Sequence, residues 1–191
     1  IAVHLAVWHD LPYSDSTPLL IRTMRRWLQI VADLYNSEPV PGWTIERFSV
    51  AIDSLAATVA RHPIAFCHND LLPPNIILNS ADGRLRFIDY EYAGVNYASF
   101  DIANHFCEWA GFDCDWAACP DKRERARFLE AYLGARQHAS TVGEWELMVG
   151  EMREAPHLFW SLWALVQARH SDIPFDYRSY AANRLSQVTE L

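Results

Sequence analysis

The hydrophobic pattern of this chain changes twice along its length, and these two changes limit the folds open to it. Up to residue 61 and again from residue 100, apolar residues recur every three or four positions, as on one face of a helix. Between these regions, short apolar runs at 64–67, 76–78 and 85–88 have the length of strands. The sequence therefore predicts a mainly α fold with a small β hairpin in its middle.

Local signals define several of the element ends. Thr17-Pro18 fits a helix N-cap followed by proline at the first helical position, and Thr141 with Glu144 fits a capping box. Residues 79–83 are a hairpin turn signal, and Pro156 should kink or split the helix that contains it. Helices are expected over residues 1–10, 17–34, 44–61, 100–109, 123–133, 141–170 and 177–188.

Composition restricts the partners of the chain. It has 191 residues, 51% of them apolar, which is enough for one sizeable core. Its formal net charge is −8 and its Lys and Arg are scattered, which argues against binding to nucleic acid and suits a small or cationic partner. The four cysteines follow no paired spacing, so we expect the reducing cytoplasm, and the apolar runs are too short to span a membrane.

The strand-length runs carry the most informative polar residues. His68-Asn69-Asp70 follows the first run, Asn75 comes five positions after Asp70, and Asp89 follows the third run. In protein kinases a catalytic-loop Asp accepts the substrate hydroxyl proton, an Asn five residues later holds one Mg²⁺, and a later Asp holds the other. Mg²⁺ prefers such oxygen ligands. Asp70, Asn75 and Asp89 are therefore predicted to be catalytic, with Asn75 and Asp89 as metal ligands.

A plainer alternative is that these residues only satisfy turn backbone, where Asp and Asn are common. Their joint spacing around a hairpin favours the phosphotransferase interpretation. Two departures from protein kinases indicate a small-molecule acceptor. Asp89 is followed by Tyr90-Glu91 rather than Phe-Gly, and the loop carries Leu71-Leu72 where a basic residue is usual.

Four segments give this pattern a family resemblance. FCHND (66–70), IDYEYAG (88–94), FDIANHFCEW (100–109) and FWSLW (159–163) resemble successive signatures of choline and ethanolamine kinases. The resemblance implies a protein-kinase-like fold of the aminoglycoside-phosphotransferase type, with ATP as co-substrate and Mg²⁺ as cofactor. Residues 1–191 would then form the C-terminal, mostly helical lobe that carries catalysis and acceptor binding.

The nucleotide lobe of such a kinase should lie upstream. The sequence before His68 contains neither a Gly-rich phosphate loop nor a strand Lys, and the chain begins with Ile rather than Met. We therefore expect these residues to belong to a longer polypeptide and to be inactive as a kinase without a β-rich N-terminal lobe.

Aromatic residues and one carboxylate form the candidate acceptor site. Aromatic faces attract ammonium groups, and a nearby carboxylate completes a cation site. Glu108 lies seven residues after Asp101 and so projects from a similar helical face. For any single ring at helical spacing, core packing is the commoner explanation. The family resemblance implies instead that the alkylammonium head is surrounded by Tyr92, Glu108, Trp160, Trp163, Phe175 and Tyr180.

Other polar residues are expected to support the loop. In kinase-like folds an Asp on the helix after the metal-binding segment bonds the loop backbone, a role that Asp101 fits. His68 is expected to be a structural part of the loop, since Asp70 occupies the position of the base. His105 with Cys107, and His4 with His9, match no common zinc spacing.

The sequence favours ethanolamine as the acceptor. NDLL (69–72) and WAGF (109–112) look like ethanolamine kinases, whereas FCEW (106–109) looks equally like choline kinases, so choline is a second candidate. Either activity would belong to phospholipid biosynthesis. An aminoglycoside kinase would need more acidic residues than aromatic ones for its polycationic acceptor. From another class, a catalytically silent binding or dimerisation lobe stays open, as does a homodimer.

Overall fold

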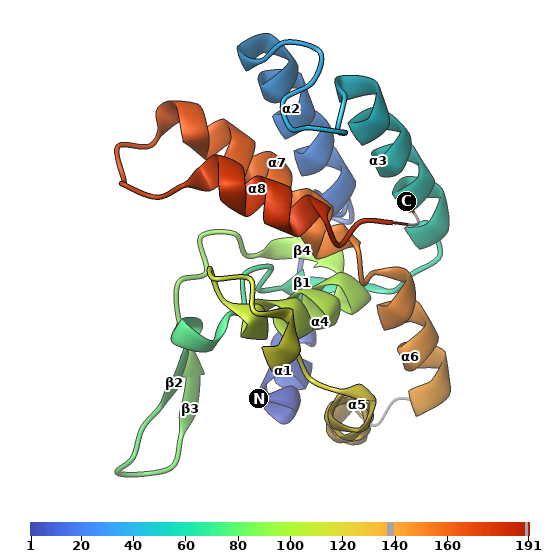
Figure 1. The fold of residues 1–191 in the computed structure, drawn as a ribbon. Helices are drawn as coiled ribbons and strands as arrows, with labels where there is room; N and C mark the ends of the chain where they lie inside the picture. The colour runs from blue at the N-terminus through green and yellow to red at the C-terminus, as the bar shows by residue number, and fades with distance from the viewer. Residues whose placement is uncertain (137–139, 190) are drawn as a thin grey trace. The chain divides into compact units, whose positions relative to one another are not determined.

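The computed structural model describes residues 1–136, 140–189 and 191. It divides into two units, which are described separately (Figure 1). The first unit comprises residues 1–18, 62–111 and 115–153. The second comprises residues 19–61, 112–114 and 154–191.

The described strands of the first unit form two antiparallel pairs. β1 (Ile64–Cys67) pairs with β4 (Gly94–Tyr97), with Cys67 opposite Gly94, and β2 (Ile76–Leu78) pairs with β3 (Leu85–Phe87). The helices of this unit are α1 (Ala2–His9), α4 (Ala98–Cys107), α5 (Lys122–Arg136) and α6 (Val142–Glu151), with 3₁₀ turns η1 (Pro73–Asn75), η2 (Glu108–Ala110) and η3 (Trp116–Ala118).

Helix α4 is the central element of the first unit. Every residue from Ala98 to Phe106 is buried, so the helix has no solvent face over that stretch. It begins directly after β4 and packs against β1 and α6, while α1 packs against α5. Its sequence nevertheless includes Asp101, Asn104 and His105, and buried polar groups of this kind need hydrogen-bond partners. Those partners lie in the loop after β1.

The second unit is helical. Its helices are α2 (Leu19–Leu34), α3 (Ile45–Val59), α7 (Ala155–His170) and α8 (Tyr177–Leu185). α7 packs against both α2 and α8, and α2 against α3 (Figure 1). Leu20, Met24 and Val31 of α2 are fully buried at the helical spacing that the sequence predicts, and the Trp27 ring lies 4.6 Å from that of Phe159.

Most of the predicted boundaries are confirmed. Pro156 splits its segment: α6 ends at Glu151, and α7 begins at Ala155 with the proline in its first turn. The capping box is present, since Thr141 accepts from the Glu144 amide and Glu144 accepts from the Thr141 amide. α2 begins at Leu19, two residues after the predicted N-cap.

Strand β4 was not predicted. Its sequence, GVNY, lacks apolar alternation because Asn96 is fully buried beside Val95. The predicted hairpin is β2–β3, closed by hydrogen bonds between residues 79 and 83 and between 79 and 84. The fold class, mainly α with a small antiparallel β part, is confirmed.

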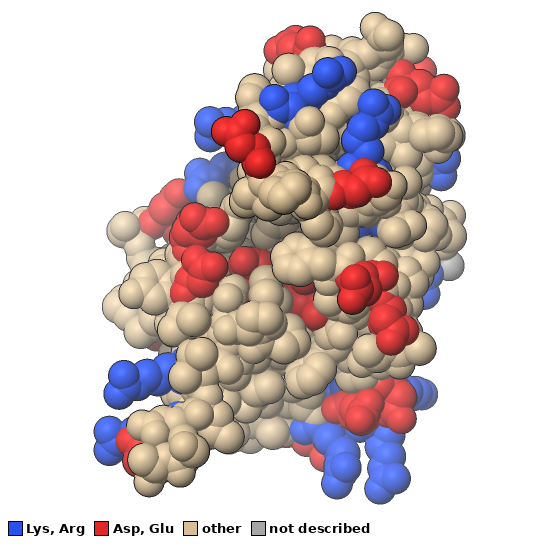
Figure 2. Space-filling view, turned by 60° about the vertical axis from the view of Figure 1, so that its left-hand side comes forward, with Lys and Arg blue, Asp and Glu red and all other residues tan. Residues whose placement is uncertain are grey.

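Surface charge agrees with the composition. On the face drawn in Figure 2, Lys and Arg side chains are interspersed with Asp and Glu and form no continuous basic patch. Among the described residues, none of the helices combines the length and apolar character needed to cross a membrane.

Candidate active site

Helix α4 holds the loop that follows β1 by its backbone. Asp101 accepts two hydrogen bonds, from the His68 amide to Oδ2 (2.8 Å) and from the Asn69 amide to Oδ1 (2.7 Å). A carboxylate that receives two backbone N–H groups fixes both peptide planes at once. The predicted role of Asp101 as a residue that bonds the loop backbone is confirmed.

The same face of α4 holds the next part of the loop. Asn104 Nδ2 donates to the Asn69 carbonyl (3.2 Å), and His105 Nδ1 donates to the Leu71 carbonyl (2.8 Å). Positions 101, 104 and 105 are related by three and four residues, which places them on one side of a helix. The backbone around Asp70 is therefore bonded to α4 on both sides.

Asn69 connects this loop to the segment that leads into β4. Its φ of 66° is left-handed, a conformation that Asn tolerates better than most residues. Its side-chain amide donates to the Tyr92 carbonyl (2.9 Å) and accepts from Asn96 Nδ2 (2.7 Å). This bond to Asn69 explains why a polar residue, Asn96, is buried in β4.

His68 connects the loop to Ile88, the residue between β3 and Asp89. Its Nε2 donates to the Ile88 carbonyl (3.0 Å), and its Nδ1 accepts from the Asp70 amide (3.3 Å). These partners assign a neutral imidazole. Burial lowers the pKa of His68, which favours the same form. His68 is structural, as predicted.

Asn75 is bonded to Asp70, and Asp89 is near enough for its charge to raise the pKa of the Asp70 carboxyl. Asn75 Nδ2 donates to the Asp70 carbonyl (2.9 Å), and the Asn75 carbonyl accepts from the Ile88 amide (3.0 Å). Asp89 has φ 59°, an uncommon left-handed conformation for a residue with a side chain, and such strain occurs often at functional sites. The structure brings all three predicted catalytic residues together.

Negative charge accumulates around Asp70. Burial raises the pKa of its carboxyl to about 7, with further contributions from the charges of Glu108, Asp89, Glu91 and Asp101, in that order. Such a cluster of carboxylates favours bound cations. The amide oxygen of Asn75 and the carboxylate of Asp89 are hard oxygen donors of the kind that Mg²⁺ takes.

The predicted acceptor residues fall in both units. Tyr92 and Glu108 belong to the first unit, and Glu108 is buried at the start of η2. In the second unit, Trp160 and Trp163 meet edge to face with centroids 5.7 Å apart. Further edge-to-face ring contacts of 4.9–5.6 Å join Trp163 to Tyr177, Phe175 to Tyr177, and Phe175 to Tyr180. The four predicted aromatic residues of this unit therefore form one cluster with Tyr177.

Comparison with known proteins identifies the family. A model of the choline/ethanolamine kinase family matches residues 1–189. The chain belongs to this family. Ethanolamine kinase 2 of Homo sapiens is 36% identical over 98% of this chain, and the match covers 51% of that protein. Ethanolamine kinase 1 of Mus musculus is 44% identical over 68% of this chain and 38% of its own length. The chain spans about half the length of the curated relatives it matches.

Solved structures agree on the fold of this choline/ethanolamine kinase family member. An ethanolamine kinase of Plasmodium vivax superposes with a TM-score of 0.87 at 26% identity, over 97% of this chain and 56% of that one. An aminoglycoside-3'-phosphotransferase of type VIII superposes with a TM-score of 0.50 at 22% identity, over 79% of this chain and 59% of that one. The predicted protein-kinase-like fold is confirmed.

Sequence reasoning missed three residues, two that hold the loop in the first unit and one in the aromatic cluster of the second unit. Asn104 and His105 lie inside the family segment 100–109, and their spacing from Asp101 is the signal that could have identified them. Phe112 completes the aromatic cluster of the second unit, with its ring 5.6 Å from Phe175 and 5.9 Å from Tyr180. It follows Gly111, whose φ of 62° marks a sharp turn after η2.

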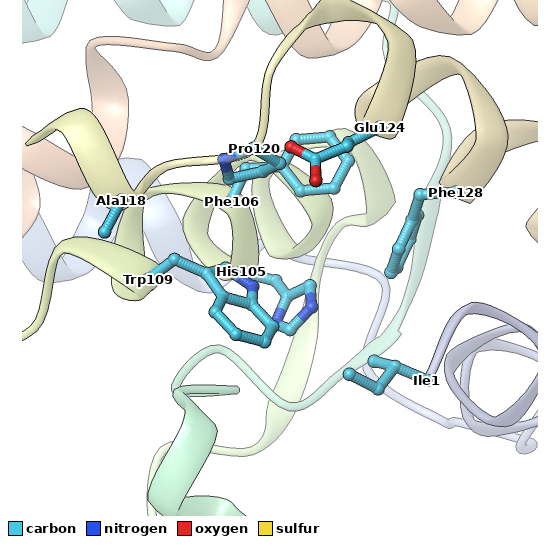
Figure 3. A pocket seen from close by; sticks show the side chains of 8 residues that line it. All are labelled: Ile1, His105, Phe106, Trp109, Ala118, Pro120, Glu124 and Phe128. Carbon is cyan, nitrogen blue, oxygen red and sulfur yellow. The ribbon is translucent and has the colours of Figure 1, made fainter.

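A pocket of about 220 Å³ lies in the first unit (Figure 3). Its walls come from the end of α4, from η2 and from α5, with Trp109 and His105 side by side and Phe128 facing them (Figure 3). The His105 and Phe128 rings are 5.4 Å apart. Four of its eight lining residues carry aromatic rings, and none of the eight is a predicted site residue.

Proposed function

We propose that the full-length protein transfers the γ-phosphoryl group of ATP to the hydroxyl of ethanolamine, with choline as a second acceptor. One observation carries this proposal. Burial is the largest cause of the raised pKa of Asp70, and the charge of Glu108 is the second largest. A carboxylate suited to an ammonium group therefore shares the electrostatic environment of the candidate base. An amino alcohol offers a cation and a hydroxyl two carbons apart, which suits that pair of residues.

The roles around the hydroxyl follow from the residue types. Asp70 orients the acceptor hydroxyl and receives its proton, and a pKa near 7 suits a general base that works near neutral pH. Asn75 and Asp89 would hold Mg²⁺, which supplies charge neutralisation for the phosphates. The loop bonds from α4 fix the Asp70 backbone, so little reorganisation is needed when substrate binds.

The ammonium head would bind to Tyr92, Glu108, Trp160, Trp163, Phe175 and Tyr180. Ring faces attract an ammonium group by their quadrupole, and the Glu108 carboxylate supplies a full charge. The relatives named above are ethanolamine kinases, which supports the primary amine as the preferred acceptor. A curated relative from Arabidopsis thaliana, 32% identical over 98% of this chain, is named a probable choline kinase, which keeps choline as the second candidate.

The cellular setting is part of the same proposal. We place the described residues in the C-terminal lobe of a larger kinase whose other lobe holds ATP. The four cysteines follow no paired spacing in the sequence, which supports a reducing cytoplasm. Ethanolamine phosphorylation there would serve phospholipid biosynthesis, and a homodimer is compatible with it.

An ADP-release assay on the full-length protein tests the proposal, with ethanolamine and choline side by side and the Asp70→Asn variant as the control. ADP release that depends on acceptor, is higher for ethanolamine and is lost in the variant supports it. Higher turnover with choline would reverse the substrate assignment. Absence of acceptor-dependent ADP release in folded wild-type protein would favour a catalytically silent binding lobe.

A further inference from the structure

Asp101 has a third partner outside the loop. His9 Nε2 lies 3.0 Å from Asp101 Oδ2, and both side chains are fully buried. His9 is the last residue of α1 and is 92 positions away from Asp101 in the sequence. The carboxylate that fixes the loop is therefore fixed in turn by a residue of a different helix.

A chain of hydrogen bonds continues from His9 to the surface. His9 Nδ1 lies 2.8 Å from the Tyr132 hydroxyl on α5, and Arg136 Nη1 donates to the same hydroxyl at 2.8 Å. Arg136 Nη2 pairs with Asp10 at 2.9 Å, and the Asp10 side chain is half exposed. All of these residues belong to the first unit.

The chemistry of the partners gives these bonds one direction. Arg can only donate, so the Tyr132 oxygen accepts from Arg136, and the Tyr132 O–H donates to His9 Nδ1. The His9 Nε2–H then donates to Asp101 Oδ2. Every member is satisfied with a neutral imidazole, and Asp101 receives three donors in its ionised form.

We propose that Arg136, Tyr132 and His9 form a relay that positions the catalytic loop by keeping Asp101 ionised and in one orientation. In this proposal all three are positioning residues, and their effect on catalysis rests on the proposed function, with Asp70 as the base. Burial alone would raise the pKa of Asp101, but the hydrogen bonds from His9 and from the His68 amide lower it.

A metal site is the alternative for the same cluster. His9, Cys67 and Asp101 place one donor atom each within 4.8 Å of one another. However, the carbonyl oxygens of Ala65 and Asn96 share the single S–H of Cys67, at 3.6 and 3.5 Å from the sulfur, and burial raises the pKa of the thiol well above the usual value. A thiol held in the protonated form is a poor ligand, since metals bind the thiolate. The geometry therefore favours hydrogen bonding over metal binding.

The test compares variants of the full-length protein. Tyr132→Phe removes only the hydroxyl, His9→Ala removes the imidazole, and His9→Gln can replace the donor to Asp101. Tyr35→Phe is the matched control, because the Tyr35 hydroxyl also makes a 2.8 Å bond, to the Leu165 carbonyl in the second unit. We expect kcat to fall about threefold to tenfold in Tyr132→Phe and more in His9→Ala, with both KM values nearly constant. His9→Gln should recover part of the loss, and Tyr35→Phe should keep wild-type kcat.

A second measurement does not depend on activity. Hydrogen exchange of the His68 and Asn69 amides, which donate to Asp101, should become faster in Tyr132→Phe and His9→Ala but not in Tyr35→Phe. Unchanged exchange and unchanged kcat in folded Tyr132→Phe would overturn the relay, as would stoichiometric zinc bound to purified protein and lost in His9→Ala. If wild type releases no ADP, the proposed function fails, and the exchange measurement still decides the relay.

Discussion

The two groups of predicted site residues are held in place by different physical means. The loop from His68 to Asn75 is fixed by directional hydrogen bonds to buried polar side chains of α4. The aromatic cluster of the second unit is fixed by ring packing at centroid distances of 4.9–5.9 Å. Hydrogen bonds depend on single atoms, whereas packing depends on volume and shape. Isosteric changes should therefore damage the loop, and the cluster should tolerate apolar replacements with a graded loss of affinity.

The largest expected effect is at Asp89. In full-length protein, Asp89→Ala should abolish turnover, because it removes an oxygen ligand that would neutralise phosphate charge. Asp82→Ala is a suitable control, since Asp82 is an exposed residue of the β2–β3 turn. Steady-state ADP release at saturating substrates measures the loss. A rate near that of wild type at ordinary Mg²⁺ would remove Asp89 from the metal site.

The next effect isolates the base. Asp70→Asn keeps the shape of the side chain but removes the proton acceptor, so kcat should fall by roughly a hundredfold or more. Burial and the neighbouring carboxylates disfavour the charged form of Asp70, so the loss of its charge removes no stabilising interaction and the Tm should barely change. Kinetics and thermal melting of the same sample test both parts. A large fall in Tm with kcat retained would favour a role in turn structure alone.

Asn75→Ala separates metal binding from loop geometry. The variant loses an amide oxygen that could bind Mg²⁺, together with the bond from Nδ2 to the Asp70 carbonyl. We expect a higher Mg²⁺ concentration for half-maximal rate, with part of the rate restored when Mg²⁺ is raised. A titration of rate against Mg²⁺ measures this. A lower kcat with an unchanged Mg²⁺ requirement would assign Asn75 to loop structure only.

A smaller effect is expected in the aromatic cluster. Trp163→Leu keeps an apolar side chain but loses the ring quadrupole, worth about 0.5–2 kcal/mol to a cation, so the KM for the amino alcohol should rise several-fold to about thirtyfold. Glu108→Gln should act similarly, and the KM for ATP should stay nearly fixed. An uncharged alcohol analogue should be insensitive to both changes. Equal increases in KM for ATP and for the amino alcohol would mean that the cluster is core packing.

The smallest effect concerns acid stability. Burial, together with the charge of Arg184, lowers the pKa of His157 to about 3. In the unfolded chain His157 becomes protonated below about pH 6.5, whereas in the folded protein it stays neutral down to about pH 3. The free energy of unfolding should therefore decrease as the pH is lowered through that window. His157→Gln should flatten this dependence in urea unfolding at pH 7 and pH 5. Parallel curves for variant and wild type would show that His157 titrates normally.

The order of the predicted catalytic residues was available from the sequence alone. Asp70, Asn75 and Asp89 are recognisable because their spacing is local and the chemistry of phosphoryl transfer prescribes the residue types. The split at Pro156 and the capping box at Thr141 were equally predictable, since proline geometry and helix capping act within one turn.

Only the tertiary structure decided which buried polar groups meet. Strand β4 could not be predicted from the sequence pattern, because its buried Asn96 is polar. Asn96 is buried because it donates a hydrogen bond to Asn69, 27 positions earlier. Nothing local to His9 indicates that it bonds both Asp101 and Tyr132, which is 123 positions away. A buried polar group requires a hydrogen-bond partner, but the sequence does not indicate which residue provides it. Packing of distant segments determines which group satisfies it, because hydrogen bonds require atoms to be within about 3 Å at a defined angle.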